Sequence, residues 1–150
     1  MNFANHPDER VRRAYQTALE AHRGQVDKSG ADYINHPLTV AAQVSDEISA
    51  IIVALLHDTI EDTNLTLNEL REKIPLTDEE TAALKLLTHD ETIPYFDYVA
   101  AIKSNSLARR VKIADLRHNS DLSRIKNPSP KDFARVEKYR AALKELGIRS

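Results

Sequence analysis

Four residues that could bind a metal ion or move a proton lie within six positions, directly after an apolar stretch. They are His57, Asp58, Glu61 and Asp62, and they follow the apolar run 51–56. Such a run predicts a helix buried inside a helical bundle, where unpaired charges at the helix end would be strongly destabilising. Because residues four apart share a helix face, His57 pairs with Glu61 and Asp58 with Asp62. We therefore expect a metal ion to hold several of these side chains together.

Two other segments carry side chains of the same kind. Asp115 and Asn119 lie four residues apart in a largely apolar segment, and His36 precedes Pro37 where a helix is predicted to begin. Taken alone, His36 also fits a histidine that only hydrogen-bonds a helix end. As a set, the nitrogen and oxygen donors suit Mn, Fe or Zn and leave coordination positions open for water. This set comprises His36, His57, Asp58 and Asp115.

The composition favours a compact all-α protein. The chain has 150 residues, the length of one domain, and a domain of this size buries roughly two thirds of the surface of its unfolded chain. Its 3 Gly, 5% aromatic and 41% hydrophobic residues favour helices over a β fold or disorder. The formal net charge of −2 predicts no general attraction to nucleic acid or to an acidic membrane. An anionic substrate must therefore be attracted by local charge.

The residue types also limit the kinds of site and the expected location. The sequence contains no cysteine, which excludes disulfides and thiolate metal ligands. Residues 1–8 lack a basic segment followed by an apolar one, and no run approaches the ~18 apolar residues of a membrane span. We therefore expect a cytoplasmic protein without a membrane partner, and the oligomeric state stays open.

Hydrophobic periodicity predicts a single domain over residues 1–150, an all-α bundle of about seven or eight helices. Thr66 with Glu69, and Thr77 with Glu80, fit capping boxes that open two of these helices. The polar segment 25–35 predicts a loop that could carry a short hairpin. The predicted helices cover about 8–23, 36–44, 46–61, 66–73, 77–88, 95–105, 107–123 and 130–146.

Five short stretches stand in an order and spacing that resemble a known family. They are AHRGQ at 21–25, KSG at 28–30, YINHPL at 33–38, ALLHDTIEDT at 54–63 and VKIAD at 111–115, followed by Asn119. Together they resemble the hydrolase domain of the RelA/SpoT stringent-response enzymes, which in single-domain form is a small alarmone hydrolase of the HD phosphohydrolase superfamily. The similarity spans about residues 11–123, and these ordered motifs are far more specific than an isolated His-Asp pair.

This resemblance implies a reaction and a role for each matching position. The reaction is removal of the 3′-pyrophosphate from ppGpp or pppGpp, usually with Mn²⁺, to give GDP or GTP. Glu61 and Asp62 match the pair that handles the attacking water and its proton. Asn119 matches a residue on the sugar side of the nucleotide, and Lys28 and Ser29 match the loop that contacts the nucleotide. The implied metal ligands are His36, His57, Asp58 and Asp115.

One position departs from the family pattern. Asp27 stands where the family usually has an arginine, whose planar guanidinium can stack on guanine, whereas a carboxylate repels a polyphosphate. Either Arg23 substitutes from the end of the preceding helix, or the substrate is a different phosphorylated nucleotide. We expect Asp27→Arg to improve binding of ppGpp. A non-catalytic nucleotide sensor is a third alternative, which the complete set of ligand and acid-base positions disfavours.

Overall fold

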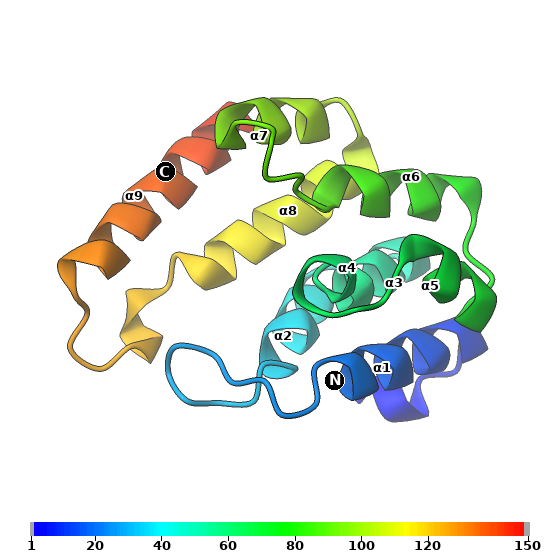
Figure 1. Cartoon of the computed structure of the whole chain (residues 1–150). Helices are drawn as coiled ribbons and strands as arrows, with labels where there is room; N and C mark the ends of the chain where they lie inside the picture. Colours follow the sequence, from blue (N-terminus) through cyan, green and yellow to red (C-terminus); the bar gives the residue numbers. More distant parts are fainter. Residues whose placement is uncertain (1, 149–150) are drawn as a thin grey trace.

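The computed structural model describes residues 2–148, and this part of the chain is all-α (Figure 1). Its helices are α1 (Glu9–Ala21), α2 (Asn35–Gln43), α3 (Ile48–Leu56), α4 (Thr59–Asp62), α5 (Leu67–Lys73), α6 (Asp78–Leu87), α7 (Tyr95–Lys103), α8 (Ser106–Asn119) and α9 (Pro130–Glu145), with the 3₁₀ turns η1 (Phe3–Asn5) and η2 (Leu122–Arg124). The β-type pairing within 2–148 is one antiparallel bridge between Val26 and Asp32, inside the segment predicted as a loop. If α3 and α4 are counted as one interrupted helix, the described chain has eight helices, in agreement with the prediction.

Local sequence explains where several helices begin. Thr66 and Thr77 each form the predicted capping box, in which the threonine hydroxyl accepts from the backbone of a glutamate three residues later and the glutamate accepts in return. Ser129 opens α9 in the same way, with Asp132 as its partner and Pro130 in the first turn. After α9, Gly147 adopts a positive φ of 92°, a conformation that suits glycine at a helix end.

The apolar run predicted to be buried forms α3, which lies at the centre of the core. Residues 50–56 are all fully buried, and α3 packs against α1, α2, α6 and α8. In Figure 1, α8 runs diagonally across the middle of the view, with α7 and α9 on one side and α2 on the other. Burial of this helix fixes the position of the residues that follow it. No described helix is long and apolar enough to cross a membrane.

The helix predicted over 46–61 is interrupted, which corrects the predicted boundaries. Regular helix ends at Leu56 and resumes at Thr59, so that His57 and Asp58 occupy the break. At this point the Thr59 hydroxyl donates to the carbonyl of Leu56 at 2.7 Å, and the His57 ring donates to the carbonyl of Ala54 at 2.5 Å. Side chains therefore satisfy the last carbonyls of α3, which lets the helix end inside the protein. Because of this break, the adjacent side chains of His57 and Asp58 can reach the same point in space.

The helix predicted over 107–123 also ends early, at Asn119. Asp121 then accepts hydrogen bonds from the backbone and hydroxyl of Ser123 and caps the short turn η2. Aspartate favours such a local cap over continuing a helix, which explains the early end. As a result Arg124 does not lie on the face of α8 but on a separate turn beside it.

Candidate metal centre

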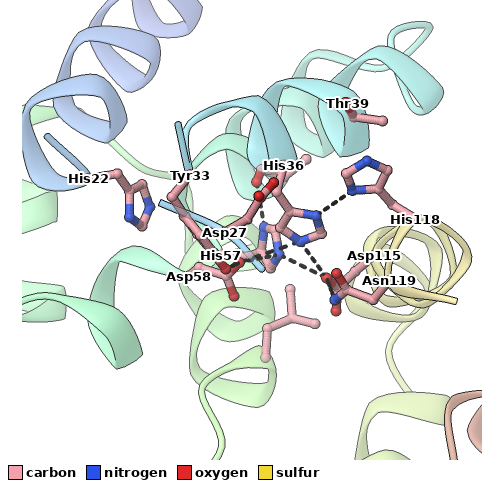
Figure 2. Close-up of polar contacts among 12 residues, drawn as sticks. His22, Asp27, Tyr33, His36, Thr39, His57, Asp58, Asp115, His118 and Asn119 are labelled. Atoms are coloured by element: carbon pink, nitrogen blue, oxygen red, sulfur yellow. Dashed lines mark hydrogen bonds and ion pairs between the residues drawn. The ribbon is translucent and has the colours of Figure 1, made fainter. Parts of the chain in front are cut away.

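Four residues from three parts of the chain converge at the break between α3 and α4. His36 comes from α2, His57 and Asp58 from the break, and Asp115 from α8 (Figure 2). Each offers one nitrogen or oxygen atom, and these four atoms all lie within 4.8 Å of one another. The two histidines and Asp115 are buried, and Asp58 is nearly so. These four side chains, which the family resemblance implied as ligands, therefore form a cluster that could hold a metal ion.

The distances within the cluster are short. His36 Nε2 lies 2.7 Å from Asp115 Oδ1 and 3.5 Å from Asp58 Oδ2. His57 Nε2 lies 3.1 Å from Asp58 Oδ2 and 3.4 Å from Asp115 Oδ1. Both imidazoles thus direct the same ring nitrogen toward the same pair of carboxylates.

The other ring nitrogens are engaged outside the cluster. His57 Nδ1 lies 2.5 Å from the Ala54 carbonyl, which can only accept, so Nδ1 carries the proton in the tautomer assigned from this contact. His36 Nδ1 lies 2.6 Å from His118 Nδ1. Desolvation and the neighbouring His36 lower the pKa of His118 to about 4, so a neutral His118 can accept from His36. Both histidines therefore direct Nε2 inward, the arrangement in which metal-binding imidazoles are usually held.

One polar atom in the cluster tests whether a metal ion fits. His57 Nε2 is buried and has no hydrogen-bond partner, although two carboxylates lie within 3.4 Å. A buried lone pair of this kind is uncommon, and a divalent cation between the imidazole and the carboxylates would engage it. The two carboxylates of the cluster also carry two negative charges, which match the charge of a divalent cation. The residues present therefore fit a divalent metal ion.

Neighbouring groups position the two carboxylates. Lys112 donates to Asp115 Oδ2 at 2.9 Å and Asn119 donates to Oδ1 at 3.1 Å. Burial opposes ionisation of Asp115, but Lys112 and the two imidazoles outweigh it and hold the pKa of Asp115 well below its usual range. The Tyr33 hydroxyl donates to Asp58 Oδ2 at 2.7 Å. Both carboxylates are therefore ionised and oriented.

Beside the cluster lies a polar cavity of about 230 Å³, which Glu61 and Asp62 help to line. Both side chains are open to this cavity, and the Glu61 carboxylate accepts from the backbone N–H of His89. Desolvation, reinforced by the charge of Asp58, raises the pKa of both groups above the ordinary values. The other residues that line this cavity are Tyr33, Asp58, His89, Tyr95, Tyr98, Lys112, Asp115, Asn119 and Tyr139.

A larger cavity of about 460 Å³ adjoins the first, and three residues line both. The shared residues are Tyr33, Asn119 and Tyr139, and the others are Val26, Asp27, Lys28, Ser29, Arg124, Ile125 and Arg135. Lys28, Ser29 and Asn119 were expected to contact the nucleotide, and the structure brings all three to this cavity. Arg23 is exposed and lines neither cavity, so the structure does not bring it to the site.

Several residues of the site were not identified from sequence. Lys112 precedes Asp115 by three residues, a helical spacing that could have indicated the contact between them. Arg124 and Arg135 had no such signal, because their approach to the loop 25–35 depends on the turn after α8 and on how α9 packs. Neither feature can be read from periodicity.

Comparison with known proteins gives relatives named as 3′-pyrophosphohydrolases and relatives named as GTP pyrophosphokinases. No protein-family model matches the chain. The zebrafish (Danio rerio) protein named guanosine-3′,5′-bis(diphosphate) 3′-pyrophosphohydrolase MESH1 is 35% identical over 135 residues, which is 81% of this chain and 73% of that protein. A probable GTP pyrophosphokinase of Mycobacterium leprae is 33% identical over 130 residues, and a 3′-pyrophosphohydrolase of Aquifex aeolicus is 43% identical over 75 residues. The chain spans only 16% and 11% of these two longer relatives.

A solved structure supports the same grouping at the level of the fold. The protein, described as a metazoan ortholog of SpoT, aligns with a TM-score of 0.75 over 95% of this chain and 88% of its own, at 20% identity. This match shows that the two chains share the all-α fold. The similarity to MESH1 is stronger, because it combines 35% identity with coverage of most of both chains. The chain therefore belongs to the family of guanosine-3′,5′-bis(diphosphate) 3′-pyrophosphohydrolases that includes MESH1.

Proposed function

We propose that this protein is a metal-dependent hydrolase that removes the 3′-pyrophosphate from ppGpp or pppGpp, giving GDP or GTP and pyrophosphate. The observation that carries this proposal is the convergence of four side chains that could hold a metal ion, one of which, His57, has a buried Nε2 without a partner. Membership of the family supports the choice of substrate, because relatives are named for this activity. The two adjoining cavities support it as well, since they offer separate spaces for a pyrophosphate group and for a nucleoside.

The proposed metal ligands are His36, His57, Asp58 and Asp115. Their mixed nitrogen and oxygen donors suit Mn²⁺, which we propose as the resident ion, although other divalent transition metals have similar preferences. A bound divalent cation would lower the pKa of water and neutralise charge on the phosphoryl oxygens. Lys112 would add one positive charge at the edge of the same cavity.

Glu61 and Asp62 are proposed to handle the protons of the reaction. Water attacks the phosphorus atom attached to the 3′-oxygen, the bond between them breaks, and the 3′-oxygen must gain a proton. A carboxylate that accepts the proton of the water and a carboxylic acid that protonates the 3′-oxygen meet both needs. The raised pKa of both groups, caused first by burial and then by the charge of Asp58, supports this role, because a carboxyl group that keeps its proton longer can act as the acid.

The nucleoside would occupy the larger cavity, with Lys28 and Ser29 on one wall. Asn119 and Tyr139 line both cavities and therefore lie where the sugar would connect the nucleoside to its 3′-pyrophosphate. Asn119 also donates to Asp115, which links the sugar position to the proposed metal site. This arrangement supports a substrate that carries its scissile group on the ribose.

A different phosphorylated nucleotide is the second candidate substrate. Asp27 favours it, because this carboxylate lines the larger cavity where the family usually has an arginine. A sensor without activity has less support, because every proposed ligand and acid-base position carries a suitable side chain. The second candidate substrate would keep the metal ion at the same cluster, whereas a sensor predicts the loss of a ligand or of the acid-base pair.

One assay separates these functions. Purified protein is stripped of metal, given Mn²⁺, Mg²⁺ or Zn²⁺, and incubated with ppGpp, pppGpp and a panel of other phosphorylated nucleotides while pyrophosphate and orthophosphate are measured. Metal-dependent pyrophosphate release from ppGpp is the expected result. Release of another product from another nucleotide would favour the second candidate, and tight binding without turnover would favour a sensor. Glu72→Gln, which removes an exposed carboxylate on α5, serves as a matched control for substitutions in the acidic cavity.

A further inference from the structure

The guanidinium of Arg124 lies on the wall of the larger cavity and makes one hydrogen bond within the described residues. Its Nη2 donates to the carbonyl of His118 at 3.3 Å, and its Nη1 lies 3.6 Å from the carboxylate of Asp27. The remaining nitrogen, Nε, is buried and has no hydrogen-bond partner. A buried N–H without a partner is destabilising, and a ligand in the cavity that Arg124 lines could supply the missing acceptor.

Asp27 only partly compensates the charge of Arg124, because its carboxylate organises its own loop. Asp27 Oδ1 accepts from the backbone of Ser29 at 2.8 Å, from the Ser29 hydroxyl at 2.6 Å and from the backbone of Ala31 at 3.1 Å. Burial opposes ionisation, but these hydrogen bonds outweigh it and lower the pKa of Asp27. At 3.6 Å the contact with Arg124 is electrostatic, without a hydrogen bond. Arg124 is therefore held near the loop while keeping donors for another acceptor.

The two cavities differ in charge. The larger is lined by three cationic side chains and one carboxylate, whereas the smaller is lined by four carboxylates and one lysine. Arg135, one of the three cations, is already paired with Asp132 at 2.6 Å, and Lys28 is exposed on the loop. Arg124 is thus the guanidinium with the least compensation at the larger cavity. An anionic group on the nucleoside side of a substrate would bind there.

We propose that Arg124 is a specificity-determining residue that binds the 5′-phosphate groups of the nucleotide in the larger cavity. The inference rests on the proposed function, since it assumes that the 3′-pyrophosphate lies at the metal cluster. The proposal explains how a site that contains Asp27 can bind a polyphosphorylated substrate. The aspartate orders the loop, and the neighbouring guanidinium of Arg124 provides the positive charge. A planar guanidinium can bind two phosphate oxygens at once, which a lysine cannot do.

The test compares how much affinity the 5′-phosphates add. Isothermal titration of metal-loaded protein with guanosine, GMP and GDP gives this gain for wild type, Arg124→Gln and Arg124→Lys. Loss of a charge-assisted hydrogen bond of about 1.5–3 kcal/mol corresponds to GDP binding weakened about 10- to 100-fold in Arg124→Gln, with guanosine binding unchanged. The affinity of Arg124→Lys for GDP should lie between those of wild type and Arg124→Gln. Arg117→Gln, an exposed arginine on α8 that does not line this cavity, is the matched control and should bind GDP normally.

The outcomes separate this inference from the proposed function. If GDP and guanosine lose affinity equally in Arg124→Gln, or if GDP binds as in wild type, Arg124 does not read the 5′-phosphates. If ppGpp is hydrolysed and its KM is the same in Arg124→Gln, the inference fails while the function stands. If GDP binding depends on Arg124 but ppGpp yields no pyrophosphate, the phosphate site stands and the proposed function fails. Circular dichroism of each variant excludes loss of fold as the cause.

Discussion

The buried carboxylate of Glu80 offers a stability test that is independent of the proposed active site. Glu80 is fully buried in the first turn of α6. It accepts from Arg10 on α1 at 2.6 Å, from the Ser49 hydroxyl on α3 at 2.6 Å and from the backbone of Thr77 at 2.9 Å. The Glu80 side chain therefore links α6 to α1 and to α3, the helix that precedes His57 and Asp58.

We predict that Glu80→Gln lowers the free energy of unfolding by about 3 kcal/mol at neutral pH. The amide keeps the shape of the side chain but loses the charge, which leaves the partly buried Arg10 without its partner. For a domain of this size a loss of about 3 kcal/mol lowers the Tm by roughly 6–12 °C. Burial opposes ionisation of Glu80, but Arg10 and the other donors outweigh it and lower its pKa. This stabilisation is present above the unfolded pKa of about 4.3 and is lost as pH falls through the lower, folded value.

Thermal unfolding followed by circular dichroism from pH 3.5 to pH 8 measures the effect. The difference in Tm between wild type and Glu80→Gln should be constant from pH 6 to pH 8 and should narrow in acid, as the carboxylate of wild type becomes protonated. Glu79→Gln, an exposed neighbour on the same turn, is the control and should change the Tm little. A difference that is absent, or that is the same at pH 3.5 and pH 7, would refute this account of Glu80.

Two further predictions concern the proposed centre, and each separates metal binding from chemistry. His57→Ala should abolish the increase in Tm that Mn²⁺ gives the wild-type protein, because it removes the buried nitrogen that has no other partner; an unchanged increase would place the ion elsewhere. Glu61→Gln and Asp62→Asn should keep that increase but lower kcat by about 10²- to 10⁴-fold. Both carboxyl groups have raised pKa values, so the rate of wild type should rise as the base loses its proton and fall as the acid loses its proton, both above the pH range of an exposed carboxyl group. A pH profile unchanged in both variants would assign proton transfer to other residues.

The helices were the most predictable part of the molecule, because their signals are local. Capping boxes at Thr66 and Thr77 and the apolar run 51–56 are short-range patterns, and the structure confirms the helices they predict. The break at His57 and Asp58 was harder to place. Its cause is a pair of side-chain hydrogen bonds to the last carbonyls of α3, which periodicity does not reveal.

Sequence predicted the residues of the proposed metal cluster better than those of the larger cavity. The proposed ligands lie in motifs that resemble a family, so His36 and Asp115 could be associated although 79 residues separate them. The role of Asp27 could not be inferred, because its partners are backbone groups of its own loop and a distant arginine. For this reason we now expect Asp27→Arg to disorder the loop, contrary to the gain in ppGpp binding that sequence suggested. In our proposal Arg124 supplies the guanidinium that Arg23 was one candidate to provide.

The most direct test of the proposed mechanism follows the oxygen atom of water. Metal-loaded protein is incubated with ppGpp in ¹⁸O-labelled water, and the products are separated and analysed by mass spectrometry. We predict equal amounts of GDP and pyrophosphate, with the label in pyrophosphate, and no reaction in His57→Ala. Release of orthophosphate, label in the 3′-hydroxyl of GDP, or equal rates with and without a divalent metal would contradict attack of metal-activated water on phosphorus.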